Sequence, residues 1–69
     1  MKNNNQVFES NALYSVADVA RILRVDVHNV YYWIDIGLLP HIKLKSTKIR
    51  GSWIDEFLEN NKGKSLTNE

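Results

Sequence analysis

The stretch between Val25 and Pro40 carries the signals for the beginning and the end of one short helix. Asp26 belongs to the residue types that cap the free N–H groups of a first helical turn. Gly37 can adopt the left-handed conformation that commonly closes a helix, and the proline follows shortly after it. So short a helix is marginal alone, and neighbouring elements must hold it. We therefore expect a helix over residues 26–36 inside a small packed domain.

The two faces of this expected helix differ in chemistry. Val30, Trp33 and Ile34 recur at spacings of three and four residues, which predicts one buried stripe. We expect one of the two neighbouring tyrosines to pack at the junction with the hairpin and the other to be exposed. Both tryptophans, at positions 33 and 53, are interpreted as core residues. The face opposite the stripe holds Val27, His28, Tyr31, Tyr32 and Asp35.

Another helix is predicted immediately before this one, over residues 16–23. Ser15 can cap its first turn and forms a capping-box pattern with Asp18. Only Arg24 and Val25 separate the two predicted helices, so the chain must change direction sharply between them. Two helices joined in this way form a helix-turn-helix unit, which either serves binding or is an ordinary helical hairpin.

Beyond the proline, apolar residues alternate with cations, a pattern typical of a β-hairpin. We expect Ile42, Leu44 and Ile49 to face inward. The turn is predicted at Ser46 and Thr47 as a distorted or slightly longer loop, because neither residue is the glycine or asparagine of a tight hairpin. The outward face of this hairpin would carry the cations Lys43, Lys45, Lys48 and Arg50.

A last helix is predicted over residues 53–60, with Ser52 and Asp55 as a second capping pattern. The order helix, turn, helix, hairpin, helix indicates an α+β, mostly helical domain over residues 12–61. The asparagine-rich stretch over residues 1–11 is expected to be a flexible arm, and residues 62–69 a flexible tail.

Composition excludes several classes of function. The 69 residues include no cysteine and only two histidines, His28 and His41, which are too far apart for a helical pair of metal ligands. No arrangement of nucleophile, histidine and acid, or of paired carboxylates, indicates catalysis. No apolar run approaches the roughly 18 residues that cross a bilayer. We therefore expect no enzymatic activity, metal, cofactor or membrane contact, and a cytoplasmic location.

Charge is unevenly distributed, although the formal net charge is only +1. Residues 36–54 contain four lysines or arginines and no acid, whereas residues 26–36 contain two acids and no lysine or arginine. A local basic strip can attract a polyanion. The alternative is a solvated strand face, on which lysines protect an edge from aggregation.

The order and spacing of these motifs resemble the small winged helix-turn-helix domains of the excisionase family, relatives of the DNA-binding domain of MerR-type regulators. The run from Lys48 to Leu58 is similar to the wing strand and closing helix of that family. Two positions depart from the pattern: the family usually has glycine in place of Arg24, and arginine or lysine in the second helix. The first part of the resemblance is carried by Ser15, Val16, Val19, Ala20, Leu23, Val25, Asp26, Val30, Tyr31, Ile34, Gly37, Leu39 and Pro40.

The resemblance implies a DNA-binding module of a bacterial or phage-infected bacterial cell. The second helix of the motif would enter the major groove, and the hairpin would lie on the backbone or in the minor groove. Partners implied are duplex DNA, an integrase or other recombinase, and weak self-association on the duplex. Candidate contacts, carried over by position, are Val27, His28, Asn29, Tyr31 and Tyr32 of the helix, Lys43, Lys45, Lys48 and Arg50 of the hairpin, and Arg21 and Arg24 near the turn.

Three functions stay open at this point. The first is an excisionase, a recombination directionality factor that bends DNA for an integrase; it is favoured because no long dimerisation helix follows the wing. The second is a small MerR-like transcriptional regulator or the DNA-binding part of a phage terminase small subunit. The third is a protein–protein adaptor that uses the tyrosine-rich helix face.

Overall fold

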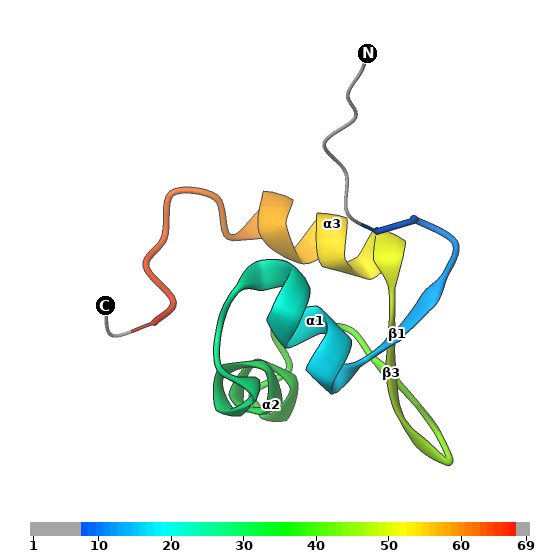
Figure 1. Cartoon of the computed structure of the whole chain (residues 1–69). Coiled ribbons are helices and arrows are strands. Elements are labelled where there is room, and N and C mark those ends of the chain that lie inside the picture. Colours follow the sequence, from blue (N-terminus) through cyan, green and yellow to red (C-terminus); the bar gives the residue numbers. More distant parts are fainter. Residues whose placement is uncertain (1–7, 68–69) are drawn as a thin grey trace.

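The computed structural model describes residues 8–67, which form three helices and three strands. Figure 1 shows α1 in the middle of the molecule, α3 along the upper edge, and both α2 and the β2–β3 hairpin reaching the lower edge. This is a small α+β winged helix-turn-helix fold, as the sequence predicted. In chain order the elements are β1 (Leu13–Ser15), α1 (Val16–Leu23), α2 (Val27–Asp35), β2 (Ile42–Leu44), β3 (Ser46–Arg50) and α3 (Gly51–Asn60).

Local capping signals set the ends of α1. The Ser15 hydroxyl accepts a hydrogen bond from the Asp18 N–H at 3.0 Å, and the Asp18 carboxylate accepts one from the Ser15 N–H at 3.4 Å. The predicted capping box is therefore confirmed. At the other end, Arg24 adopts the left-handed conformation with φ 60° and ψ 46°. This arginine thus takes the backbone conformation that a glycine at this position would adopt most readily.

The signals predicted for α2 are confirmed as well. The Asp26 carboxylate accepts a hydrogen bond from the His28 N–H at 3.1 Å, which caps the first turn. Gly37 has a φ of +77° and ends the helical segment. The next N–H group, that of Leu38, donates to the carbonyl oxygen of Trp33 at 2.8 Å.

The hairpin is part of a three-stranded antiparallel sheet with the order β1-β3-β2. The additional strand, β1, precedes α1 and was not expected from the sequence. Tyr14 in β1 pairs with Ile49 in β3, so both lie on the same, inner face. Because three strands share this sheet, the wing is anchored to the start of the helix-turn-helix unit.

The predicted turn of the hairpin is wrong. Lys45 alone separates the two strands, and Leu44 pairs with Ser46. A loop at residues 46–47 would instead have placed Leu44 opposite Ile49. Side chains alternate along a strand, so a register change of this kind moves residues to the other face of the sheet.

Two of the three hairpin residues expected to face inward therefore face outward. Ile42 and Leu44 are 41% and 46% exposed, whereas Ile49 is fully buried. Ile42 pairs with Lys48, so this lysine shares the outer face with an exposed apolar side chain. The outer face of the sheet consequently carries both apolar and cationic side chains.

α3 begins two residues earlier than expected and without Ser52 as its cap. Its N-cap residue makes no side-chain capping bond. Instead the Gly51 N–H donates to the Ala12 carbonyl and the Ser52 N–H to the Ser10 carbonyl, both at 2.9 Å. A Cβ atom at Gly51 would collide with the carbonyl oxygen of Glu9, so the N-terminal segment crosses directly over this glycine. A segment distant in the sequence therefore replaces the predicted local cap.

Residues 8–11 contact the domain through side chains too. The Phe8 ring meets the Tyr14 ring edge-on, with centroids 6.2 Å apart. Arg50 donates a hydrogen bond to the side-chain oxygen of Asn11 at 2.9 Å. The flexible arm was expected to extend over residues 1–11; its last four residues make these contacts, and residues 1–7 lie outside the described part of the chain.

One apolar core joins the elements. Trp33 of α2 and Phe57 of α3 pack with ring centroids 5.0 Å apart. Trp33 is buried and Trp53 packs against the same cluster, which confirms the interpretation of both tryptophans as core residues. The buried members of this cluster are Val16, Val19, Ala20, Val30, Trp33, Leu39, Ile49, Ile54 and Phe57.

Candidate nucleic-acid interface

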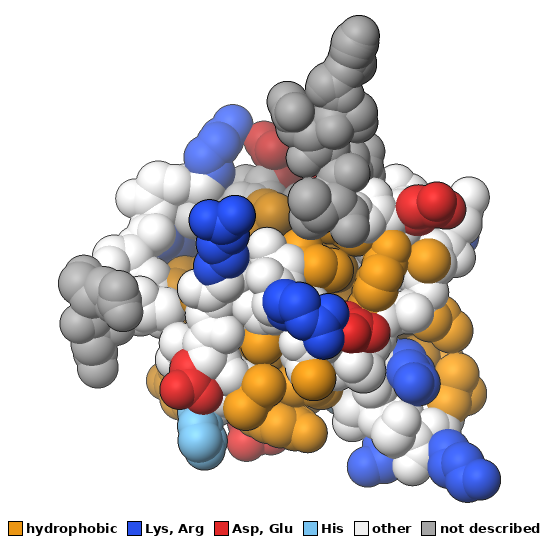
Figure 2. Space-filling model, viewed as in Figure 1, with side chains coloured by type: hydrophobic (Ala, Val, Ile, Leu, Met, Phe, Trp, Pro, Cys, Tyr) orange, Lys and Arg blue, Asp and Glu red, His pale blue; other side chains and the backbone are white. Residues whose placement is uncertain are grey.

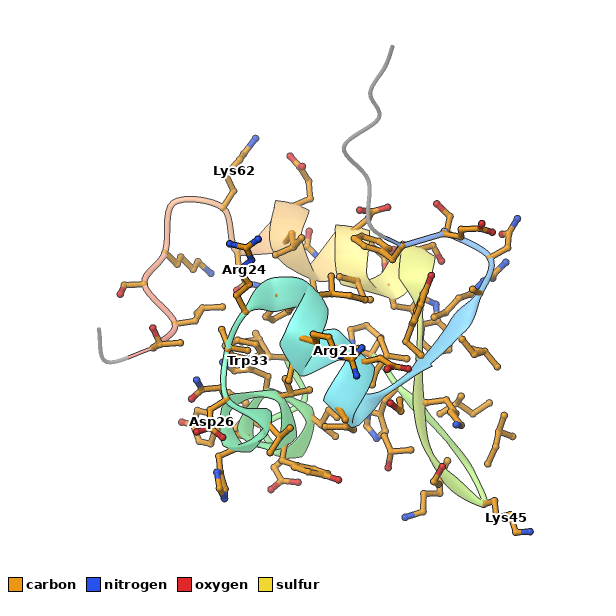
Figure 3. The ribbon with its side chains drawn as sticks, in the orientation of Figure 1. Arg21, Arg24, Asp26, Trp33, Lys45 and Lys62 are labelled. Atoms are coloured by element: carbon orange, nitrogen blue, oxygen red, sulfur yellow. The ribbon has the colours of Figure 1, made fainter. Side chains whose placement is uncertain are left out.

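The surface predicted to contact DNA is formed by α2 and the hairpin. In Figure 3, Asp26 at the start of α2 and Lys45 at the hairpin tip both lie toward the lower edge of the molecule. α3 runs along the upper edge, and α1 lies between α3 and the lower edge. The fold thus brings two of the three predicted sets of contacts, those of α2 and of the hairpin, to the lower edge of the molecule.

α2 exposes every one of its predicted contact residues at least in part. Tyr31 and Tyr32 are 51% and 58% exposed, so the expectation that one of them packs in the interior is wrong. Tyr14, from β1, packs against the core instead. β1 pairs with β3 and places Tyr14 opposite the buried Ile49, so a tyrosine of β1 rather than of α2 packs beside the hairpin.

The remaining α2 candidates lie on different parts of this face. Val27 and His28 are exposed, whereas Asn29 is half-buried. Asn29 and Tyr32 line a surface hollow together with residues 65–67 of the C-terminal segment. Leu66 of that segment packs against the core, which holds the segment beside α2. The C-terminal segment therefore borders one flank of the candidate surface.

The first turn of α2 contains a small polar cluster. The Asp26 carboxylate accepts the His28 N–H and also lies 3.0 Å from Nδ1 of the same histidine. The hydrogen bond from the His28 backbone, followed by that from its ring, holds the pKa of Asp26 below its usual value. The carboxylate is therefore engaged within the protein, and it adds negative charge where a helix N-terminus alone would attract phosphate.

The hairpin cations do not share one face. Lys45 occupies the tip with a φ of +49°. Lys43 pairs with Thr47 on the face that carries Ile49, whereas Lys48 pairs with Ile42 on the outer face. The predicted single cationic face is therefore wrong, for the same reason of register, although Lys43 and Lys45 are both exposed near the tip.

Arg50 lies at the opposite end of β3 from the tip. It pairs with Leu13 across the sheet, and its guanidinium binds Asn11. This arginine is exposed but is held near the start of α3, away from the hairpin tip. Figure 2 shows basic side chains at the lower right, over the hairpin, with apolar side chains beside them along the right side of the molecule.

The two arginines of the helix-turn-helix unit differ in position. Arg21 is exposed on α1 and forms an ion pair with Asp18, with Nη1 and Oδ1 3.1 Å apart. Arg24 lies at the upper end of α1, on the side of α3, well away from the lower edge. The fold therefore does not bring Arg24 together with the α2 and hairpin candidates.

Within residues 8–67 no three histidine, cysteine or acidic side chains come together in a way that could hold a metal ion. The helices of this same part of the chain are all too short or too polar to cross a membrane.

Comparison with known proteins agrees with the architecture. A family model described as a helix-turn-helix domain matches residues 13–62. That span extends from the first residue of β1 to just beyond α3 and so includes every element described above. No curated protein and no solved structure matches the chain significantly.

Proposed function

The chain belongs to the helix-turn-helix domain family, a DNA-binding family that includes excisionase-like proteins, and from this premise we propose that it is an excisionase-type protein that binds and bends duplex DNA. In this proposal α2 occupies the major groove and the β2–β3 hairpin contacts the backbone or the adjacent minor groove. Bound DNA is thereby prepared for excision by an integrase.

The position of α2 and the hairpin at one edge of the molecule is the observation that carries the proposal. Both elements reach the same edge of the molecule, and both expose side chains there. A winged helix-turn-helix domain needs this arrangement, because the two elements must contact one duplex at the same time.

The distribution of charge supports separate roles for the two elements. Lys43 and Lys45 are exposed at the hairpin tip and are suited to phosphate oxygens. α2 has no lysine or arginine of its own. We therefore assign most of the salt-sensitive attraction to the hairpin, with Arg21 of α1 as an additional candidate, and the contacts with base edges to α2.

Salt dependence of duplex affinity tests the proposal. Each phosphate contact contributes roughly −0.9 to the slope of log affinity against log salt concentration. The double variant Lys43→Ala/Lys45→Ala should bind more weakly than the parent and show a slope shallower by about two units. Lys62→Ala is the matched control, because Lys62 pairs with Glu59 at the upper edge of the molecule.

Two results would contradict parts of the proposal. If the parent has no duplex affinity at low salt but retains a recombinase or another phage protein on a column, the chain is an adaptor acting through the exposed tyrosine face. If it binds a selected site but leaves the DNA straight in a circular-permutation mobility assay, DNA binding stands and the excision role fails.

A further inference from the structure

The chemistry of α2 restricts the bases that it can recognise. α2 is described over its whole length, and none of its nine residues is a lysine or an arginine. Arginine and lysine are the side chains that most commonly read guanine in the major groove, through its O6 and N7 atoms. A major-groove helix without them lacks the commonest readers of G·C pairs.

Val27 and Tyr31 form an apolar and aromatic strip on the exposed face of α2, which also carries His28 and Asp35. Val27 and Tyr31 are four residues apart, so they lie one above the other on the helix. Both are exposed; Val27 is the first residue of α2 and Tyr31 is its central residue, and the N-terminal part of a recognition helix is the part that contacts base edges. Asn29 and Tyr32 border the hollow beside residues 65–67 instead.

Thymine is the base that such a strip fits. Its C5-methyl group projects into the major groove and is read by apolar side-chain contact. We infer that Val27 and Tyr31 contact thymine methyl groups and that the stretch of major groove occupied by α2 is rich in A·T pairs. This inference rests on the proposed DNA binding and specifies which DNA the same surface recognises.

The two acidic residues, Asp26 and Asp35, stand at the two ends of α2. A free carboxylate can accept a hydrogen bond from cytosine N4. Oδ1 of Asp26 already accepts the His28 N–H and lies beside the His28 ring, and Asp26 is the N-cap residue that precedes the helix. Asp35 is the last residue of α2 and lies outside the half of the helix that contacts base edges.

Removal of single methyl groups from the DNA tests the inference. A preferred duplex is first selected from a random pool, and each thymine of the selected site is then replaced by deoxyuridine, which lacks only the C5-methyl group. For thymines in contact with α2, the parent should lose about fourfold in affinity per methyl group, the factor that corresponds to one buried methyl-sized group. Val27→Ala and Tyr31→Ala should each abolish that loss at one thymine.

Matched variants separate side-chain contact from a general loss of binding. Tyr31→Phe retains the ring and should keep the full sensitivity to deoxyuridine. Leu58→Ala removes an exposed apolar side chain of α3 and should also keep it. Thermal melting confirms that each variant is folded before its affinity is compared.

Three outcomes decide the matter. An A·T-rich selected site with deoxyuridine sensitivity that disappears in the Val27 or Tyr31 variant supports the inference. A selected site with G·C pairs under α2, or equal affinity for thymine and deoxyuridine duplexes, overturns it while DNA binding stands. Absence of any duplex affinity at low salt overturns the proposed function together with this inference.

Discussion

Arg24 and Lys45 share a left-handed backbone conformation, with φ values of 60° and 49°, but they lie at opposite edges of the molecule. They are the two non-glycine residues with positive φ in residues 8–67. Arg24 turns the chain from α1 into α2, and Lys45 turns it from β2 into β3. A cationic residue thus adopts the left-handed conformation at both turns, and only Lys45 belongs to the candidate interface.

Glycine at either position should stabilise the fold. A left-handed residue with a Cβ atom costs roughly 1–2 kcal/mol, and part of the gain is lost to the greater freedom of glycine in the unfolded chain. We expect Arg24→Gly and Lys45→Gly each to raise the free energy of unfolding by about 0.5–1 kcal/mol. Urea denaturation measures the change. A decrease in both variants would show that side-chain contacts outweigh backbone strain.

The same two variants should differ in DNA affinity. Lys45→Gly should weaken duplex binding and reduce the salt slope by about one unit, because it removes a phosphate contact at the hairpin tip. Arg24→Gly should leave both quantities unchanged, since Arg24 points away from the α2 and hairpin edge. An equal loss of affinity in the two variants would place the DNA on a different surface.

Gly51→Ala should destabilise the protein even though alanine is the better helix former. A Cβ atom at this position meets the Glu9 backbone, so the N-terminal segment must move and lose its hydrogen bonds to the start of α3. We expect a loss of roughly 1–3 kcal/mol in the free energy of unfolding. Asn60→Ala, at the exposed end of α3, is the control and should change little. Stabilisation by Gly51→Ala would mean that residues 9–10 do not pack there.

Three truncations in the hairpin test the strand register. Ile49→Ala removes a fully buried side chain and should cost about 2–5 kcal/mol of stability. Ile42→Ala and Leu44→Ala remove outward-facing side chains, and each should cost less than about 1 kcal/mol. The register predicted from the sequence would bury Leu44 opposite Ile49, and a cost for Leu44→Ala as large as that for Ile49→Ala would restore it.

Acid should weaken the caps of both helices of the helix-turn-helix unit. Hydrogen bonds from the Ser15 backbone and hydroxyl, with the Arg21 guanidinium, lower the pKa of Asp18, and bonds from His28 lower the pKa of Asp26. The pKa of an aspartate is ~3.9 in the unfolded chain and lower in the folded protein when such bonds are present. The carboxylate therefore contributes its full stabilisation above the unfolded pKa, and this stabilisation is lost as the pH falls through the folded pKa. Urea denaturation from pH 7 to pH 2.5 should therefore show a steeper acid loss in the parent than in Asp18→Asn/Asp26→Asn. Superimposable pH profiles would exclude this role of the two carboxylates.

The sequence predicted the helix part of the candidate site better than the hairpin part. Val27, His28 and the tyrosine pair could be assigned to one helix face because helical periodicity separates them from Val30 and Trp33. The exposure of both tyrosines could not be predicted, since one of them was expected to pack at the junction with the hairpin. The faces of the hairpin could not be assigned in the same way, because alternation in a strand depends on the turn that sets its register. A one-residue turn at Lys45 has no glycine or asparagine to reveal it.

The sequence alone determined where α1 begins and where α2 begins and ends, since Ser15, Asp26 and Gly37 act on backbone groups only a few residues away. The tertiary structure decided the pairing of β1 with β3, the start of α3 at Gly51, and the edge at which each cation lies. The first two of these features depend on hydrogen bonds between segments that are 33 to 42 residues apart in the chain. Local strand propensity does not predict such pairings, because many arrangements of the same strands are equally compatible with it. The burial of Ile49 in the core selects one of these arrangements.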